Sequence, residues 1–129
     1  MSDGSQHHSR TTYLNWIALH DLNRFGGYVL DAFGHYPYLV GSALVRPDYR
    51  DVDVRLILPD DEFAATFGEV LTPRYTNAKW NATCVVWTHF AAHLTGLPID
   101  FQIDQQTWAN ENTTGRRHAI GGPHGLGPG

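Results

Sequence analysis

The sequence predicts an α/β (α+β) domain in which a few short strands are backed by helices. Apolar and polar residues alternate over 51–58 and again over 97–104, which is typical of half-buried strands. Apolar residues recur with helical spacing over 11–34 and 76–95. The chain has 129 residues, a length that suits one domain with a core of moderate size.

Composition narrows the functional classes. The hydrophobic fraction is 42% and the charged fraction 17%, as in globular proteins. A formal net charge of −4 argues against a protein that holds nucleic acid mainly through a basic surface, although it allows a nucleotide as ligand. Cys84 is the only cysteine, which excludes an internal disulfide and a cysteine-based zinc site. We find no apolar signal-peptide core and no run of about 18 apolar residues, and therefore expect a cytoplasmic protein without a membrane span.

The N-terminal third predicts a loose end followed by a helix. Residues 1–10 are polar, and we expect them to be disordered. The helix over 11–34 is weakened by Gly26-Gly27, where we expect it to bend or split, and Gly34 is suited to its C-cap.

The stretch from Tyr38 to Leu58 organises the rest of the chain. A first strand over 37–41 ends at a Gly-Ser pair, and a second strand follows over 51–58. Side chains alternate on a strand, so three charged residues of the second strand share one face while the apolar ones point to the core. The charged residues are Asp51, Asp53 and Arg55, and the apolar ones are Val52, Val54 and Leu56.

Two neighbouring carboxylates on one strand face repel each other unless a cation lies nearby. The usual reason to keep such a pair is a divalent metal with oxygen ligands, most often magnesium. Gly41 and Ser42 stand where a strand turns into a helix, and there a close backbone and free N–H groups attract phosphate. The combination favours metal-assisted nucleotidyl transfer over the plainer alternative of solvated aspartates.

The segment GSALVRPDYRDVDV resembles the Gly-Ser…Asp-x-Asp pattern of the DNA polymerase beta-like nucleotidyltransferase superfamily. The resemblance covers about residues 11–104. It implies a minimal nucleotidyltransferase fold, similar to the polymerase beta palm, with a small mixed sheet backed by helices. We accordingly expect a single domain over 11–110.

The superfamily has a third carboxylate on a neighbouring strand, flanked by apolar residues. The strand over 97–104 offers two candidates. Asp100 matches the pattern best because Ile99 and Phe101 flank it, and Asp104 is the alternative.

The resemblance implies a reaction and a set of site residues. An NMP group would move from an NTP, with ATP as the default donor, to a hydroxyl acceptor with release of pyrophosphate. Asp51, Asp53 and Asp100 would be the catalytic carboxylates and would hold two magnesium ions. The residues expected to bind the nucleotide are Gly41, Ser42, Arg46, Arg50 and Arg55.

The C-terminal half predicts a long helix and a flexible end. His89 and His93 lie four residues apart on the helix over 76–95, but no third zinc ligand is evident, and we interpret them as packing or surface residues. A short helix or turn is expected over 105–114. Residues 111–129 form a Gly/Pro-rich stretch that we expect to be a mobile tail.

Other readings of the same motif remain open. The resemblance leaves the acceptor open among RNA, a protein and a small molecule, and it allows a second copy of the chain or a toxin-like partner to complete the site. A different class of function is a non-catalytic interaction protein of the same fold, similar to an antitoxin. A third is a nucleotide sensor that binds an NTP without turnover.

Overall fold

The computed structural model describes residues 12–68 and 77–122. Their helices are α2 (Trp16–Phe33), α3 (Ser42–Val45), α4 (Asp60–Phe67), α5 (Ala78–Thr95) and α6 (Gln106–Asn112). The strands are β1 (Tyr38–Val40), β2 (Val52–Leu58), β3 (Ile99–Gln105) and β4 (His118–Ala119), in the sheet order β3-β2-β1-β4. β1 is antiparallel to β2 and to β4, whereas β2 and β3 are parallel. The predicted α/β (α+β) class with a small mixed sheet is confirmed.

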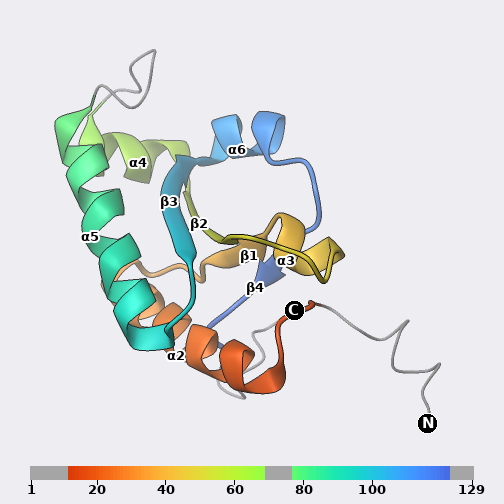
Figure 1. The fold of residues 1–129 in the computed structure, drawn as a ribbon. Helices are drawn as coiled ribbons and strands as arrows, with labels where there is room; N and C mark the ends of the chain where they lie inside the picture. Colours follow the sequence, from red (N-terminus) through yellow and green to blue (C-terminus); the bar gives the residue numbers. More distant parts are fainter. Residues whose placement is uncertain (1–11, 69–76, 123–129) are drawn as a thin grey trace, which may run out of the picture.

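Helices α2 and α5 cover one face of the sheet, and the core lies between them and the strands (Figure 1). An aromatic cluster joins these layers: the ring of Phe25 on α2 contacts Trp87 and Phe90 on α5 and Phe101 on β3, with centroid separations of 5.5–6.1 Å. Such contacts add to the free energy of burial. None of the helices in the described part of the chain is both long and apolar enough to span a bilayer.

Helix α2 begins later than predicted and does not break at its two glycines. The side chain of Asn15 accepts a hydrogen bond from the N–H of Ala18 and so starts the helix at Trp16. Gly26 allows a close backbone approach in mid-helix: a Cβ there would lie 2.7 Å from the carbonyl carbon of Ile120. Tertiary packing therefore compensates for the low helix propensity of glycine.

Residues 111–122 differ from the predicted mobile tail, because the first two of them end α6 and the rest pack on the fold. β4 pairs with β1, and Ile120 is completely buried. The N–H of Gly121 donates a hydrogen bond of 2.7 Å to Asn23 Oδ1 on α2. Glycine is needed at position 121 because the chain passes close to α2 there: a Cβ on Gly121 would lie 2.7 Å from the carbonyl carbon of Gly26. The predicted disordered residues 1–10 and the remainder of the tail, 123–129, lie outside the described residues.

Side chains of α5 cover the outer edge of β3. The Thr88 hydroxyl donates to the carbonyl of Phe101 and accepts from the N–H of the same residue, both at 3.1 Å. Trp80 Nε1 donates to the carbonyl of Ile103 at 2.7 Å. These bonds pair backbone groups that an edge strand otherwise exposes, and they hold α5 at a fixed position beside β3.

Candidate functional site

Two aspartates from different strands lie side by side on the face of the sheet opposite α2 and α5. The parallel register makes Asp53 of β2 and Asp100 of β3 direct Cα partners. Nη2 of Arg55 lies 3.3 Å from Asp100 Oδ2 and 3.9 Å from Asp53 Oδ1. Asp51 stands immediately before β2 and is exposed. The structure thus brings Asp53, Arg55 and Asp100 together, with Asp51 beside them in the chain.

Arg55 is held in place by the backbone as well as by the carboxylates. Its Nη1 donates to the carbonyl of Asp100 at 2.8 Å and to that of Val54 at 3.1 Å. The side chain is only 15% exposed. A guanidinium fixed in this way offsets part of the repulsion between the two aspartates and leaves the group with net negative charge.

Gly41 brings the backbone against one of these carboxylates. It lies between β1 and α3 with φ +77° and ψ −153°, a conformation that is essentially restricted to glycine. A Cβ at this position would lie 2.5 Å from Asp53 Oδ2. The predicted order of strand, Gly-Ser turn and helix is present, with Ser42 as the first residue of α3.

The pKa of Asp53 is raised above the ordinary value of 3.8. Burial is the main cause, since it disfavours the charged form. Arg55 lowers the pKa, and the charges of Asp100 and Asp51 raise it further. A carboxylate under such repulsion gains from binding a cation.

The raised pKa predicts that Asp53 makes the stability of the metal-free protein depend on pH. Below the ordinary pKa of 3.8 the carboxyl is protonated in the folded and the unfolded protein alike, and it does not lower the free energy of unfolding. As the pH rises from there through the folded-state pKa, the carboxyl ionises more readily in the unfolded protein than in the folded one. The free energy of unfolding therefore falls. In thermal unfolding with EDTA, the melting temperature of Asp53→Asn should therefore rise relative to that of wild type as the pH is increased above 3.8. A difference between the two proteins that does not change with pH would contradict this assignment.

The carboxylates fit part of a magnesium site. In the described part of the chain, no group of three or more His, Cys, Asp or Glu side chains is arranged to hold a metal ion. Magnesium in proteins commonly uses only one or two carboxylates, with water and substrate phosphates as its other ligands. Asp53 and Asp100 would be these two carboxylates, and a Cβ at Gly41 would lie within 2.5 Å of Asp53 Oδ2.

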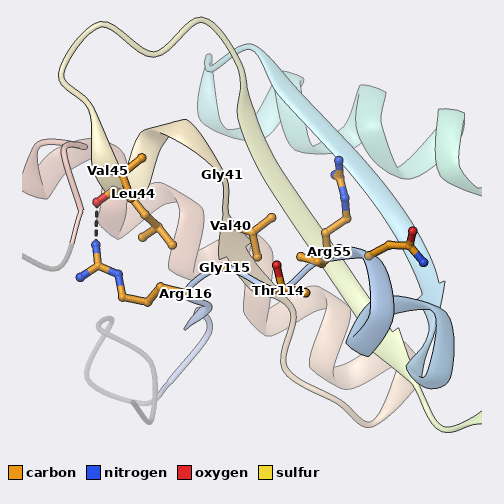
Figure 2. A pocket seen from close by; sticks show the side chains of 10 residues that line it. Val40, Gly41, Leu44, Val45, Arg55, Thr114, Gly115 and Arg116 are labelled. Carbon is orange, nitrogen blue, oxygen red and sulfur yellow. Dashed lines mark hydrogen bonds between the residues drawn. The ribbon is translucent and has the colours of Figure 1, made fainter.

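A pocket of about 400 Å³ adjoins this group on the Gly41 side (Figure 2). Val40 and Leu44 provide apolar walls, and residues 112–116, which connect α6 to β4, provide polar ones. Arg55 and Arg116 line opposite sides of the pocket in Figure 2. Nη2 of Arg116 donates to the carbonyl of Leu44 at 2.6 Å. The pocket therefore combines apolar surface with two arginines, and Arg55, which bonds Asp100, connects its lining to the carboxylate pair.

Comparisons of the chain with protein-family models, with curated proteins and with solved structures find no match. The resemblance to the polymerase beta-like superfamily rests on the residues from Gly41 to Asp53 and on Asp100.

The loop arginines lie apart from this pocket. Arg46 follows α3 and is mostly exposed, with Nε 3.7 Å from Asp48 Oδ1, and Arg50 is exposed. Neither lines the pocket, whereas Arg55 does. Arg116 is not among the predicted site residues, because it lies in the Gly-rich stretch that the composition predicts to be a tail. The only signal was the Arg-Arg pair at 116 and 117.

Burial distinguishes the two candidates for the third carboxylate. Asp104 is completely buried on β3, but the side chain of Asp100 is 46% exposed. Asp100 is therefore the one of the two that a ligand can reach. His89 and His93 are exposed on α5.

Proposed function

We propose that this protein is a metal-dependent nucleotidyltransferase that moves an NMP group from an NTP to a hydroxyl acceptor. The observation that carries the proposal is the position of Asp53, whose register partner is Asp100, against the backbone of Gly41, which lines a pocket with two arginines. Carboxylates coordinate metal ions and arginines bind phosphate groups. The aspartates and the arginines of the site therefore match the metal ion and the phosphates of a metal-bound triphosphate.

The donor nucleotide would occupy the pocket of Figure 2. Gly41 and Ser42 would bind the β- and γ-phosphates, and Arg55 and Arg116 would neutralise charge on them. The apolar wall at Val40 would contact the nucleoside. A volume of about 400 Å³ lies within the range of ligand pockets, and ATP remains the default donor.

The reaction would be an in-line displacement at the α-phosphorus. The oxygen of the acceptor hydroxyl forms a bond to this phosphorus, the bond to the oxygen that bridges to the β-phosphate breaks, and pyrophosphate leaves. Asp100, which is accessible, would take the proton of the acceptor and pass it to solvent. Magnesium held by Asp53, Asp100 and, by the resemblance, Asp51 would supply charge neutralisation and lower the pKa of the acceptor hydroxyl.

Pyrophosphate release from each of the four NTPs, with Mg²⁺ and with cell extract as the source of acceptor, tests this function. Wild type should release pyrophosphate, and Asp53→Asn should lower the rate by about 100-fold or more, since a charge directed at the transition state is lost. Asp31→Asn, a change of the same kind at an exposed position on α2, serves as the control and should leave the rate unchanged.

Equal rates for wild type and Asp53→Asn would contradict the site. Binding of Mg-NTP that requires Asp53 but leads to no release would instead favour the sensor or the antitoxin-like protein. If the protein neither binds Mg-NTP nor releases pyrophosphate, the proposed function is refuted.

A further inference from the structure

Arg55 contacts both aspartates of the candidate site with the same nitrogen atom. Its Nη2 lies 3.3 Å from Asp100 Oδ2 and 3.9 Å from Asp53 Oδ1. The two carboxylates belong to neighbouring strands, because Asp53 and Asp100 are register partners in the parallel pair of β2 and β3. The guanidinium therefore neutralises the same pair of carboxylates that the proposed function assigns to a divalent cation.

A cation that binds this pair meets the charge of Arg55. Two positive charges that share the same ligands repel each other, and the repulsion is strong where water is partly excluded. The side chain of Arg55 is only 15% exposed, and Nη1 is also bonded to the carbonyls of Asp100 and Val54. Salt screens such a fixed, part-buried charge much less than a surface charge. Arg55 and a divalent cation are therefore competitors for Asp53 and Asp100.

The side chain of Arg55 also lines the pocket that the proposed function assigns to the donor. Figure 2 shows Arg55 and Arg116 on opposite sides of this pocket. Arg116 is bonded to the carbonyl of Leu44, whereas Arg55 is bonded to the carboxylate of Asp100. Phosphate groups in the pocket would offer the guanidinium of Arg55 a second anionic partner.

We propose that Arg55 competes with the divalent cation for Asp53 and Asp100, and that the phosphates of the donor relieve this competition by binding Arg55. The inference rests on the proposed function and adds regulation to its metal site. The cation by itself binds weakly, and the cation together with a triphosphate binds tightly. By linkage, each of the two ligands then raises the affinity for the other.

Three variants separate the charge of Arg55 from its place in the fold. Arg55→Met removes the guanidinium and keeps a long unbranched side chain. Arg55→Lys keeps the positive charge but loses the planar fork that bonds two carbonyls and a carboxylate. Arg24→Met is the matched control, because Arg24 is exposed on α2, which covers the other face of the sheet, and the net charge changes equally.

The first readout is binding of Mn²⁺ alone, followed by electron paramagnetic resonance. Arg55→Met should bind Mn²⁺ at least about tenfold more tightly than wild type, because a competing state reduces the apparent affinity of wild type. Arg24→Met and Arg55→Lys should both stay within about threefold of wild type, the latter because its ammonium still competes. If Arg55 only held the carboxylates in position, both Arg55 variants would bind Mn²⁺ more weakly than wild type.

The second readout is binding of inorganic tripolyphosphate with Mg²⁺, followed by calorimetry. This probe carries the phosphates that all four NTPs share, so the result does not depend on the base of the donor. Arg55→Met should bind it at least about tenfold more weakly than wild type, since the phosphates lose a guanidinium partner. Arg24→Met should bind it as wild type does. The effect of Arg55→Met therefore changes sign between the cation alone and the cation with phosphates.

A third readout needs no variant at the site and so does not depend on how Arg55→Met folds. In ¹H–¹⁵N NMR spectra of the wild-type chain, Mg²⁺ should shift the Nε–H signal of Arg55 and leave that of Arg24 in place. A cation that saturates the site without shifting the signal of Arg55 would overturn the inference.

The Mn²⁺ measurement on Asp53→Asn distinguishes failure of the competition from failure of the metal site. Suppose that Asp53→Asn binds Mn²⁺ at least about tenfold more weakly than wild type, as the loss of a carboxylate ligand predicts, while Arg55→Met and Arg24→Met bind it equally. The metal site then stands and the competition is overturned. Equal binding of Mg-tripolyphosphate by these two arginine variants would overturn the second half of the inference. If Asp53→Asn binds Mn²⁺ as wild type does, the metal site of the proposed function fails and the inference fails with it.

Discussion

Replacement of Gly26 by alanine should destabilise the fold by about 3 kcal/mol, because overpacking of a closely packed contact costs about this much. A Cβ at Gly26 would lie 2.7 Å from two backbone atoms of Ile120 and 2.8 Å from the N of Gly121. Backbone atoms cannot rotate away as a side chain does. The segment would have to move off α2, which would expose the buried Ile120 and strain the bond between Gly121 and Asn23.

Gly27 offers a matched control on the same helix. A Cβ there meets nothing within 4 Å, so alanine should stabilise the protein by about 1 kcal/mol through helix propensity alone. The free energies of unfolding of both variants and of wild type would be measured in urea. A change of the same sign and size at Gly26 and Gly27 would show that the segment around Ile120 does not pack on α2 as described.

Gly41→Ala should weaken the proposed metal and nucleotide binding and also lower the stability of the fold. The backbone conformation at Gly41 costs about 1–3 kcal/mol for a residue with a side chain. In addition, the new Cβ would lie 2.5 Å from Asp53 Oδ2, and the carboxylate would have to turn away. We expect Mn²⁺ binding, followed by electron paramagnetic resonance, and Mg-NTP binding, followed by calorimetry, to fall by about tenfold or more.

Gly34→Ala is the control for this variant, because it strains the backbone at a positive φ but lies away from the candidate site. It also has a positive φ, +79°, but it ends α2 and a Cβ there meets nothing within 4 Å. Gly34→Ala should cost about 1–2 kcal/mol in stability and leave ligand binding as in wild type. Should both variants bind Mn²⁺ and Mg-NTP as wild type does, the contact between Gly41 and Asp53 would have no role in binding.

The local elements around the site can be predicted from the sequence alone. Strict alternation over β2 assigned Asp53 and Arg55 to one face, and the burial of that strand in the structure alternates in the same way. The order of strand, Gly-Ser turn and helix around Gly41 was also predicted from the sequence and is present in the structure. These features depend on residues close together in the chain, and periodicity and turn residues report such relations directly.

The contacts between residues far apart in the chain could not be predicted in this way. The register of β2 and β3 places Asp53 beside Asp100, and complete burial removes Asp104 from reach. Arg116 reaches the carbonyl of Leu44 across 72 positions of the chain, from a segment whose composition resembles a tail. Sheet register and close backbone packing are set by contacts far apart in sequence, and these leave no period in the sequence itself.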